Sequence, residues 1–169
     1  MTDLELIRSP HDRRLYELGH AGTVRLVGWA ARVASAETAD GRRYDVARRG
    51  VFRPGVDATD ATGTAVGRFS ARGMRRGGTL RWMGRVMELR PASRWRERYA
   101  LAEGDRELAV FEGKGWGKRP VTVTVDHDAA LDPGLLLFTA FVVRGLAEDA
   151  GAVAAGTSAA TAATAAAGS

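Results

Sequence analysis

The sequence predicts a mainly β fold, a closed barrel of about twelve short strands that encloses one hydrophobic helix near the C-terminus. Two patterns lead to this prediction. Short segments of alternating apolar and polar residues recur between Gly, Asp and Pro residues, and one continuous apolar run follows them. The chain has 169 residues, of which 45% are hydrophobic, so it can form one ordinary domain with a single core.

The strands are recognised by alternation and by the turns between them. The clearest strand is 121–125, where valine and threonine alternate. Two pairs of segments flank turn-forming dipeptides and predict hairpins: 31–37 with 42–48 across Asp40-Gly41, and 94–101 with 106–112 across Gly104-Asp105. Around Gly84 the apolar positions change parity, which indicates a β-bulge or a barrel corner.

One segment near the C-terminus predicts a helix. Asp132 is a candidate N-cap and Pro133 suits the first helical position. The residues that follow, 135–143, are apolar on all sides apart from Thr139, so a helix here must be enclosed completely. At 1.5 Å per residue the run is about 13 Å long, too short to cross a bilayer. The protein's own sheet is therefore expected to surround it.

These elements divide the chain into three parts. Residues 1–12 are predicted to be an N-terminal arm, and 13–149 the barrel domain with its helix at about 133–148. Residues 150–169 contain only Ala, Gly, Thr, Ser and Val, a composition that predicts a disordered tail. The first residues include acids and no apolar signal region, so we expect a cytoplasmic protein.

The order of these elements resembles that of the tubby C-terminal-like superfamily, which includes LURP-one-related proteins and phospholipid scramblases. The similarity is carried by Arg-Tyr-Ala-Leu at 98–101, by 109–113 and by Pro-Gly-Leu-Leu-Leu-Phe at 133–138, and it extends over about 22–146. It implies a 12-stranded barrel around a central helix. By analogy it also implies binding of phospholipid headgroups through basic surface residues, although no headgroup motif can be matched residue by residue.

The positive charge of the chain is concentrated in one stretch of sequence. Ten arginines between positions 68 and 98 are opposed only by Glu88 and Glu97: Arg68, Arg72, Arg75, Arg76, Arg81, Arg85, Arg90, Arg94, Arg96 and Arg98. Such a region can bind phosphate groups of lipids or nucleic acids. The alternative interpretation is a solvated barrel exterior on which arginines simply point outward along the strands.

A second candidate is the glycine-rich segment 113–119, which adds three cations and Trp116. It is not a Walker loop, because Arg119-Pro120 stands where that motif has Ser or Thr opening a helix. Its structural alternative is a hairpin loop covered by a packed tryptophan. The predicted residues for binding an anionic ligand are Arg72, Arg75, Arg76, Arg94, Arg96, Arg98, Lys114, Lys118 and Arg119.

Catalytic signals are missing from the sequence. There are no cysteines, and the three histidines are scattered without a metal-binding or triad pattern. We therefore predict a protein without enzymatic activity, cofactor or metal, whose barrel binds an anionic surface, foremost phospholipid headgroups, and which would then be a peripheral membrane protein. The alternatives are a nucleic-acid-binding protein that uses the same basic region, and a structural or adaptor barrel with a protein partner.

Overall fold

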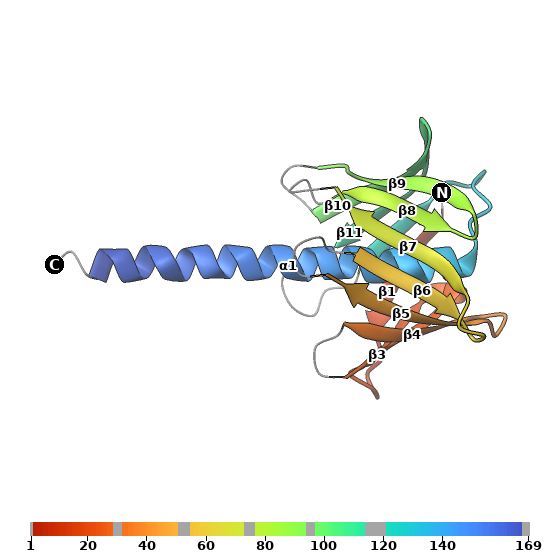
Figure 1. Cartoon of the computed structure of the whole chain (residues 1–169), viewed down its shortest axis with the longest axis horizontal. Helices are drawn as coiled ribbons and strands as arrows, with labels where there is room; N and C mark the ends of the chain where they lie inside the picture. Colours follow the sequence, from red (N-terminus) through yellow and green to blue (C-terminus); the bar gives the residue numbers. More distant parts are fainter. Residues whose placement is uncertain are drawn as a thin grey trace.

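The computed structural model of the chain describes residues 2–28, 32–50, 55–72, 77–93, 97–113 and 121–166. Within them twelve strands form one closed antiparallel barrel, in which each strand pairs with its neighbours in sequence. Figure 1 shows this barrel around one long helix. The strands are β1 (Thr2–Arg8), β2 (Leu15–Leu18), β3 (Gly22–Val27), β4 (Val33–Thr38), β5 (Arg43–Arg49), β6 (Gly55–Asp60), β7 (Ala65–Ala71), β8 (Gly78–Trp82), β9 (Arg85–Pro91), β10 (Glu97–Glu103), β11 (Arg106–Gly113) and β12 (Val121–Val125). A short 3₁₀ turn, η1 (Gly19–Ala21), joins β2 to β3.

The N-terminal segment closes the barrel, so the prediction of an arm over 1–12 is wrong. Strand β1 pairs with β12 on one side and with β2 on the other, with Thr2 opposite Val125 and Leu6 opposite Leu18. Its leucines Leu4 and Leu6 are buried. Without β1, the strands β2 and β12 would each have an unpaired edge. Closure of the barrel removes such edges by pairing them.

The predicted hairpins are confirmed, with one correction. Strands β4 and β5 pair across the Asp40-Gly41 turn, and β10 and β11 pair across Gly104-Asp105. The parity change near Gly84 is not a bulge. Trp82 pairs with Arg85, and Met83 and Gly84 both have positive φ angles, 46° and 84°, as a two-residue hairpin turn requires.

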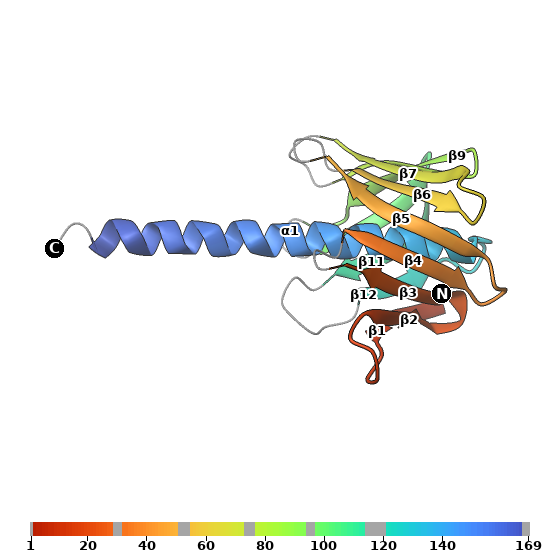
Figure 2. The same ribbon diagram turned by 60° about the horizontal axis from the view of Figure 1, so that its bottom comes forward.

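The helix α1 (Pro133–Ala166) runs through the barrel, as Figure 2 shows. Its apolar residues are enclosed as predicted: Phe138 is 1% exposed and Phe141 4%. The one polar residue of this stretch, Thr139, donates its hydroxyl to the carbonyl oxygen of Leu135 at 2.8 Å, which satisfies a group that is cut off from water. We call the end of the barrel where α1 begins the entry end, and the end where it leaves the exit end.

The helix also continues to Ala166, where the sequence predicted an end near 148 and a disordered tail from 150. This is a correction with a simple local reason. Alanine has the highest helix propensity, and adding residues to an existing helix avoids the cost of nucleation. Among the described residues, no helix combines the length and the hydropathy that crossing a bilayer requires.

Asp132 fixes the start of α1 and confirms the predicted N-cap. Its Oδ1 accepts the backbone N–H of Leu135 at 3.1 Å and the indole N–H of Trp82 at 3.2 Å. Its Oδ2 accepts a hydrogen bond from Arg42 at 2.7 Å. The Trp82 ring lies against Phe138 of the helix, with 5.4 Å between the ring centroids. One carboxylate therefore ties the helix to the β4–β5 connection and to β8.

Candidate anionic-surface interface

The alternation of strand direction places every second connection at the same end of the barrel. The chain leaves β1, β3, β5, β7, β9 and β11 at the exit end and re-enters there. Arg72 directly follows β7, and Arg98 lies at the start of β10, so both of these predicted residues belong to the exit end. Both are exposed.

The other predicted residues, Arg75, Arg76, Arg94, Arg96, Lys114, Lys118 and Arg119, lie outside the described residues. The described strand ends that flank them do have a common position. They are the ends of β7 and β8, of β9 and β10, and of β11 and β12, and all six belong to the exit end.

Most described arginines of the 68–98 stretch have carboxylate partners. Arg72 and Arg90 share Glu88, at 3.2 and 2.8 Å, and Arg68 shares Asp57 with Arg49, both at 2.8 Å. Because one carboxylate serves two guanidinium groups, each trio keeps a net positive charge. Arg90 and, to a lesser extent, Arg72 hold the pKa of Glu88 below its ordinary value, so this carboxylate stays ionised.

The structure adds arginines that the sequence analysis did not single out. At the exit end, arginine side chains of β1, of the β1–β2 connection and of the segment before β4 are exposed and form no ion pair with another described residue. They are Arg8, Arg13, Arg14 and Arg32. They lie far from 68–98 in sequence, and the signal that could have found them is the alternating direction of the predicted strands.

Exposed aliphatic side chains lie among these arginines. Ile7 is 53% exposed, Val27 49% and Val33 43%. Ile7 is the neighbour of Arg8 near the end of β1, and Val27 and Val33 face each other where β3 ends and β4 begins. The exit-end rim over β1 to β4 is therefore both cationic and apolar.

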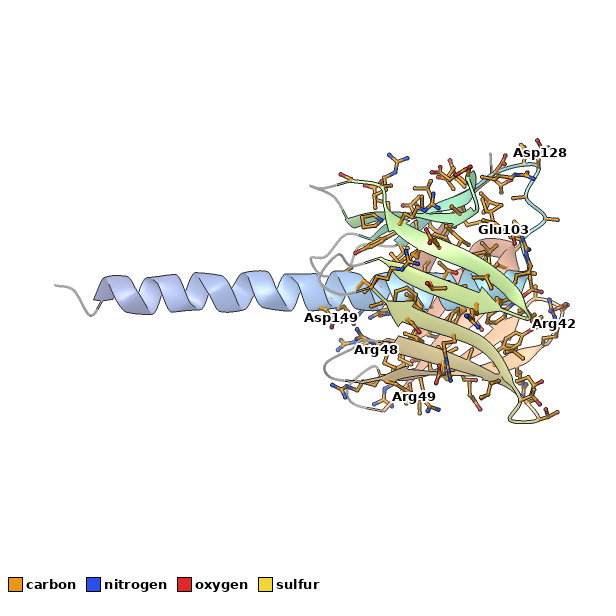
Figure 3. All side chains as sticks on the ribbon, turned by 45° about the horizontal axis from the view of Figure 1, so that its top comes forward. Arg42, Arg48, Arg49, Glu103, Asp128 and Asp149 are labelled. Atoms are coloured by element: carbon orange, nitrogen blue, oxygen red, sulfur yellow. The ribbon has the colours of Figure 1, made fainter. Side chains whose placement is uncertain are left out.

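The entry end has the opposite charge. Among the described residues near it, carboxylates outnumber arginines: Asp40, Asp60, Glu103, Asp105, Glu107, Asp126, Asp128 and Asp132 against Arg42, Arg43, Arg85 and Arg106. Figure 3 shows the two ends, with Arg48 and Arg49 at the exit end and Glu103 and Asp128 at the entry end. The barrel is thus polarised along its axis.

Two further arginines hold the helix where it leaves the barrel. Arg48 donates to the carbonyl oxygen of Gly145 at 3.2 Å and also pairs with Asp149. Arg144 pairs with Glu148 at 2.9 Å, and its guanidinium lies 4.0 Å from the centre of the Tyr16 ring. These contacts engage the charges of Arg48 and Arg144 within the protein, so we assign both residues to positioning of the helix.

Two hollows on the barrel are candidate pockets, and the described residues hold no cluster of three metal-ligating side chains. One hollow of about 720 Å³ lies on the outer face of β7 to β9, and one of about 250 Å³ lies at the entry end beside His20 and His127. In neither hollow does a hydrogen bond among the described residues link a lining hydroxyl group to an imidazole or carboxylate base, the contact that an activated nucleophile requires. The absence of catalysis stays a prediction.

No family model, no curated protein and no solved structure matches this chain. The twelve-stranded barrel around a helix agrees with the architecture that the sequence resemblance implied. Membership of the tubby C-terminal-like superfamily stays a prediction, because unrelated proteins can share an architecture. The function that this resemblance implied stays a prediction for the same reason.

Proposed function

We propose that the protein is a non-enzymatic module whose exit end binds an anionic phospholipid surface. The observation that supports this most is the separation of charge along the barrel axis, with exposed aliphatic side chains among the arginines of the exit end. A basic surface is attracted to anionic headgroups, by about 1 kcal/mol for each Arg or Lys near the membrane. Apolar side chains on the same rim add burial at the headgroup boundary.

The exposed apolar residues favour lipid over nucleic acid. Proteins that bind single strands present aromatic rings on which bases stack. Among the described residues, the large exposed hydrophobic side chains are Ile7, Val27, Val33, Met83 and Val86, and none of them is aromatic. Aliphatic groups beside arginines gain little from a sugar-phosphate backbone, whereas they gain from contact with acyl chains.

The test is vesicle co-sedimentation of the full chain with phosphatidylcholine vesicles and with vesicles that also contain phosphatidylserine. We expect binding to the anionic vesicles only. Replacing Arg13 and Arg14 by serine removes two unpaired exit-end charges and should lower the apparent affinity roughly thirtyfold, from about 1 kcal/mol per charge. A second variant, Arg72→Ser with Arg75→Ser and Arg76→Ser, tests the arginines predicted from sequence.

The matched control is Arg43→Ser with Arg106→Ser, which removes the same charge from the entry end. Equal losses in the Arg13/Arg14 variant and in this control would contradict a role for one end. Equal binding to both kinds of vesicle would contradict an electrostatic interaction. If a labelled oligonucleotide binds in a salt-dependent way and vesicles do not, the nucleic-acid alternative replaces the proposal, and if neither binds, a protein partner becomes the better interpretation.

A further inference from the structure

The hollow on the outer face of β7 to β9 combines exposed apolar side chains with arginine. It has a volume of about 720 Å³ and is lined by outward-facing Val66, Arg68, Arg81 and Val86 and by Met83 of the β8–β9 turn. Met83 is 51% exposed and Val86 53%. We call this the hollow face. It is partly open to solvent and lined mainly by strand exteriors, so a folded surface fits it better than a small molecule, which binding sites usually enclose on most sides.

Arg81 lies in the hollow face without a carboxylate. It stands directly opposite Arg68 in the β7–β8 pairing, and like charges in that position repel. Arg68 pairs at 2.8 Å with Asp57, which it shares with Arg49, but Arg81 forms no ion pair with another described residue. On its other side Arg81 pairs with Val86. An incoming carboxylate would relieve the repulsion between the two arginines, and apolar groups beside it would cover Val86 and Met83.

The opposite side of the same barrel carries the complementary chemistry. The outward row of β1 consists of Asp3, Glu5 and Ile7, and Ile7 is paired with Glu17 of β2. All four side chains are exposed. The three carboxylates form no ion pair with another described residue. We call this row, with Glu17, the acidic face. In the closed strand order β1 stands half-way round the barrel from β7, and Figure 2 shows β1 and β2 on the opposite side of α1 from β7 and β9.

We propose that the acidic face of one copy of this chain docks on the hollow face of another. Glu5 and its neighbouring carboxylates would meet Arg81, and Ile7 would enter the hollow beside Met83 and Val86. Because the two faces are different and lie on opposite sides of the barrel, the contact is heterologous and adds copies in a row. This inference does not depend on the proposed binding to lipid.

The size of the faces predicts a weak contact. Three strands about 4.8 Å apart make a face about 14 Å wide, and strands of 5 to 7 residues are about 17 to 23 Å long. The face therefore covers roughly 240 to 320 Å², well below the roughly 800 Å² per partner of a standard interface. We therefore expect reversible association that grows with protein concentration and weakens at high salt. Juxtaposed like charges oppose association strongly, so reversal of one central charge should weaken it about tenfold or more.

Two charge reversals test the proposal because each one reverses the central charge of one face and leaves the other face unchanged. Arg81→Glu reverses the charge in the hollow face, and Glu5→Arg reverses the central charge of the acidic face. Sedimentation equilibrium of the full chain at micromolar to millimolar concentrations should show wild-type protein associating without a fixed limit, and each variant alone associating at least about tenfold more weakly. An equimolar mixture of the two variants should associate again, since their two intact faces fit each other and their two reversed charges also attract.

The controls are Arg43→Glu and Asp45→Arg, which make the same charge changes on the outer face of β5, between the two faces. Both should associate as the wild-type protein does. Circular dichroism checks the fold, and Arg81→Gln with Glu5→Gln replaces the reversals if either of them unfolds the barrel. A wild-type chain that stays monomeric throughout overturns the proposal. So does association that both single variants retain at full strength, or a mixture of the variants that associates no more than either variant alone.

Discussion

Replacing Asp132 by alanine should destabilise the protein more than the loss of one surface charge would. The side chain accepts three hydrogen bonds, from Leu135 N, Trp82 Nε1 and Arg42. Loss of a helix N-cap costs about 1 kcal/mol. Trp82 is 2% exposed, and a buried donor without an acceptor costs about 1 to 3 kcal/mol. The partly exposed ion pair with Arg42 adds at most about 1 kcal/mol.

These contributions predict a loss of about 2 to 5 kcal/mol in the free energy of unfolding for Asp132→Ala. Equilibrium urea unfolding, followed by circular dichroism, measures it as a lower midpoint at an unchanged slope. The matched variant is Asp132→Asn, which keeps an oxygen for Leu135 and Trp82 and loses only the charge that faces Arg42. It should cost about 1 kcal/mol. If both variants lose the same stability, or if Asp132→Ala loses less than Asp132→Asn, the assignment of Asp132 as the anchor of the helix is refuted.

Two further predictions concern the barrel. In Gly67→Ala the new Cβ would lie 2.6 Å from Cε3 of Trp82, so the core is overpacked and we expect a loss of about 1 to 3 kcal/mol by thermal unfolding. In a Trp82→Phe background, Gly67→Ala should cause a smaller loss of stability. An equal loss in that background would argue against the clash with the Trp82 ring. Arg90 and Arg85 lower the pKa of Glu88 and Glu103 below the ordinary 4.5, so these pairs stabilise the fold above about that pH and are lost as pH falls through the lower folded values. Glu88→Gln with Glu103→Gln should therefore flatten the loss of stability below pH 4.5, and an acid profile parallel to that of the wild-type protein would contradict this.

The fold could be predicted largely from local patterns. The alternation in 121–125 and the turn dipeptides Asp40-Gly41 and Gly104-Asp105 each specify a strand or a hairpin without reference to distant residues. The apolar run of α1 was enough to predict that the helix is enclosed by the sheet. A helix that is apolar on all sides is not stable in water, and this run is too short to cross a bilayer. The first strand was missed because its alternating pattern is short, with Leu4 and Leu6 separated by acidic residues. The burial of these leucines depends on pairing with β12, which is the last strand in the sequence.

The candidate interface was predicted less well than the fold. The arginines of 68–98 stand out in the sequence because they are close together in the chain, yet the structure pairs Arg68, Arg72, Arg85 and Arg90 with carboxylates. Arg8, Arg13, Arg14 and Arg32, which keep their charge unpaired among the described residues, are spread over separate segments. Neighbouring charges in a sequence do not show which of them will meet an acid across the sheet.

The amino-acid sequence alone determined the class of fold, the hairpins and the enclosed helix, because each depends on periodicity and turn chemistry that act over a few residues. Only the tertiary structure decided which strand closes the barrel and which arginines form ion pairs. It also decided that basic and acidic residues gather at opposite ends. The physical reason is that antiparallel closure sends alternate connections to the same end and brings distant strands together. A surface charge therefore acquires its neighbours only when the barrel has formed.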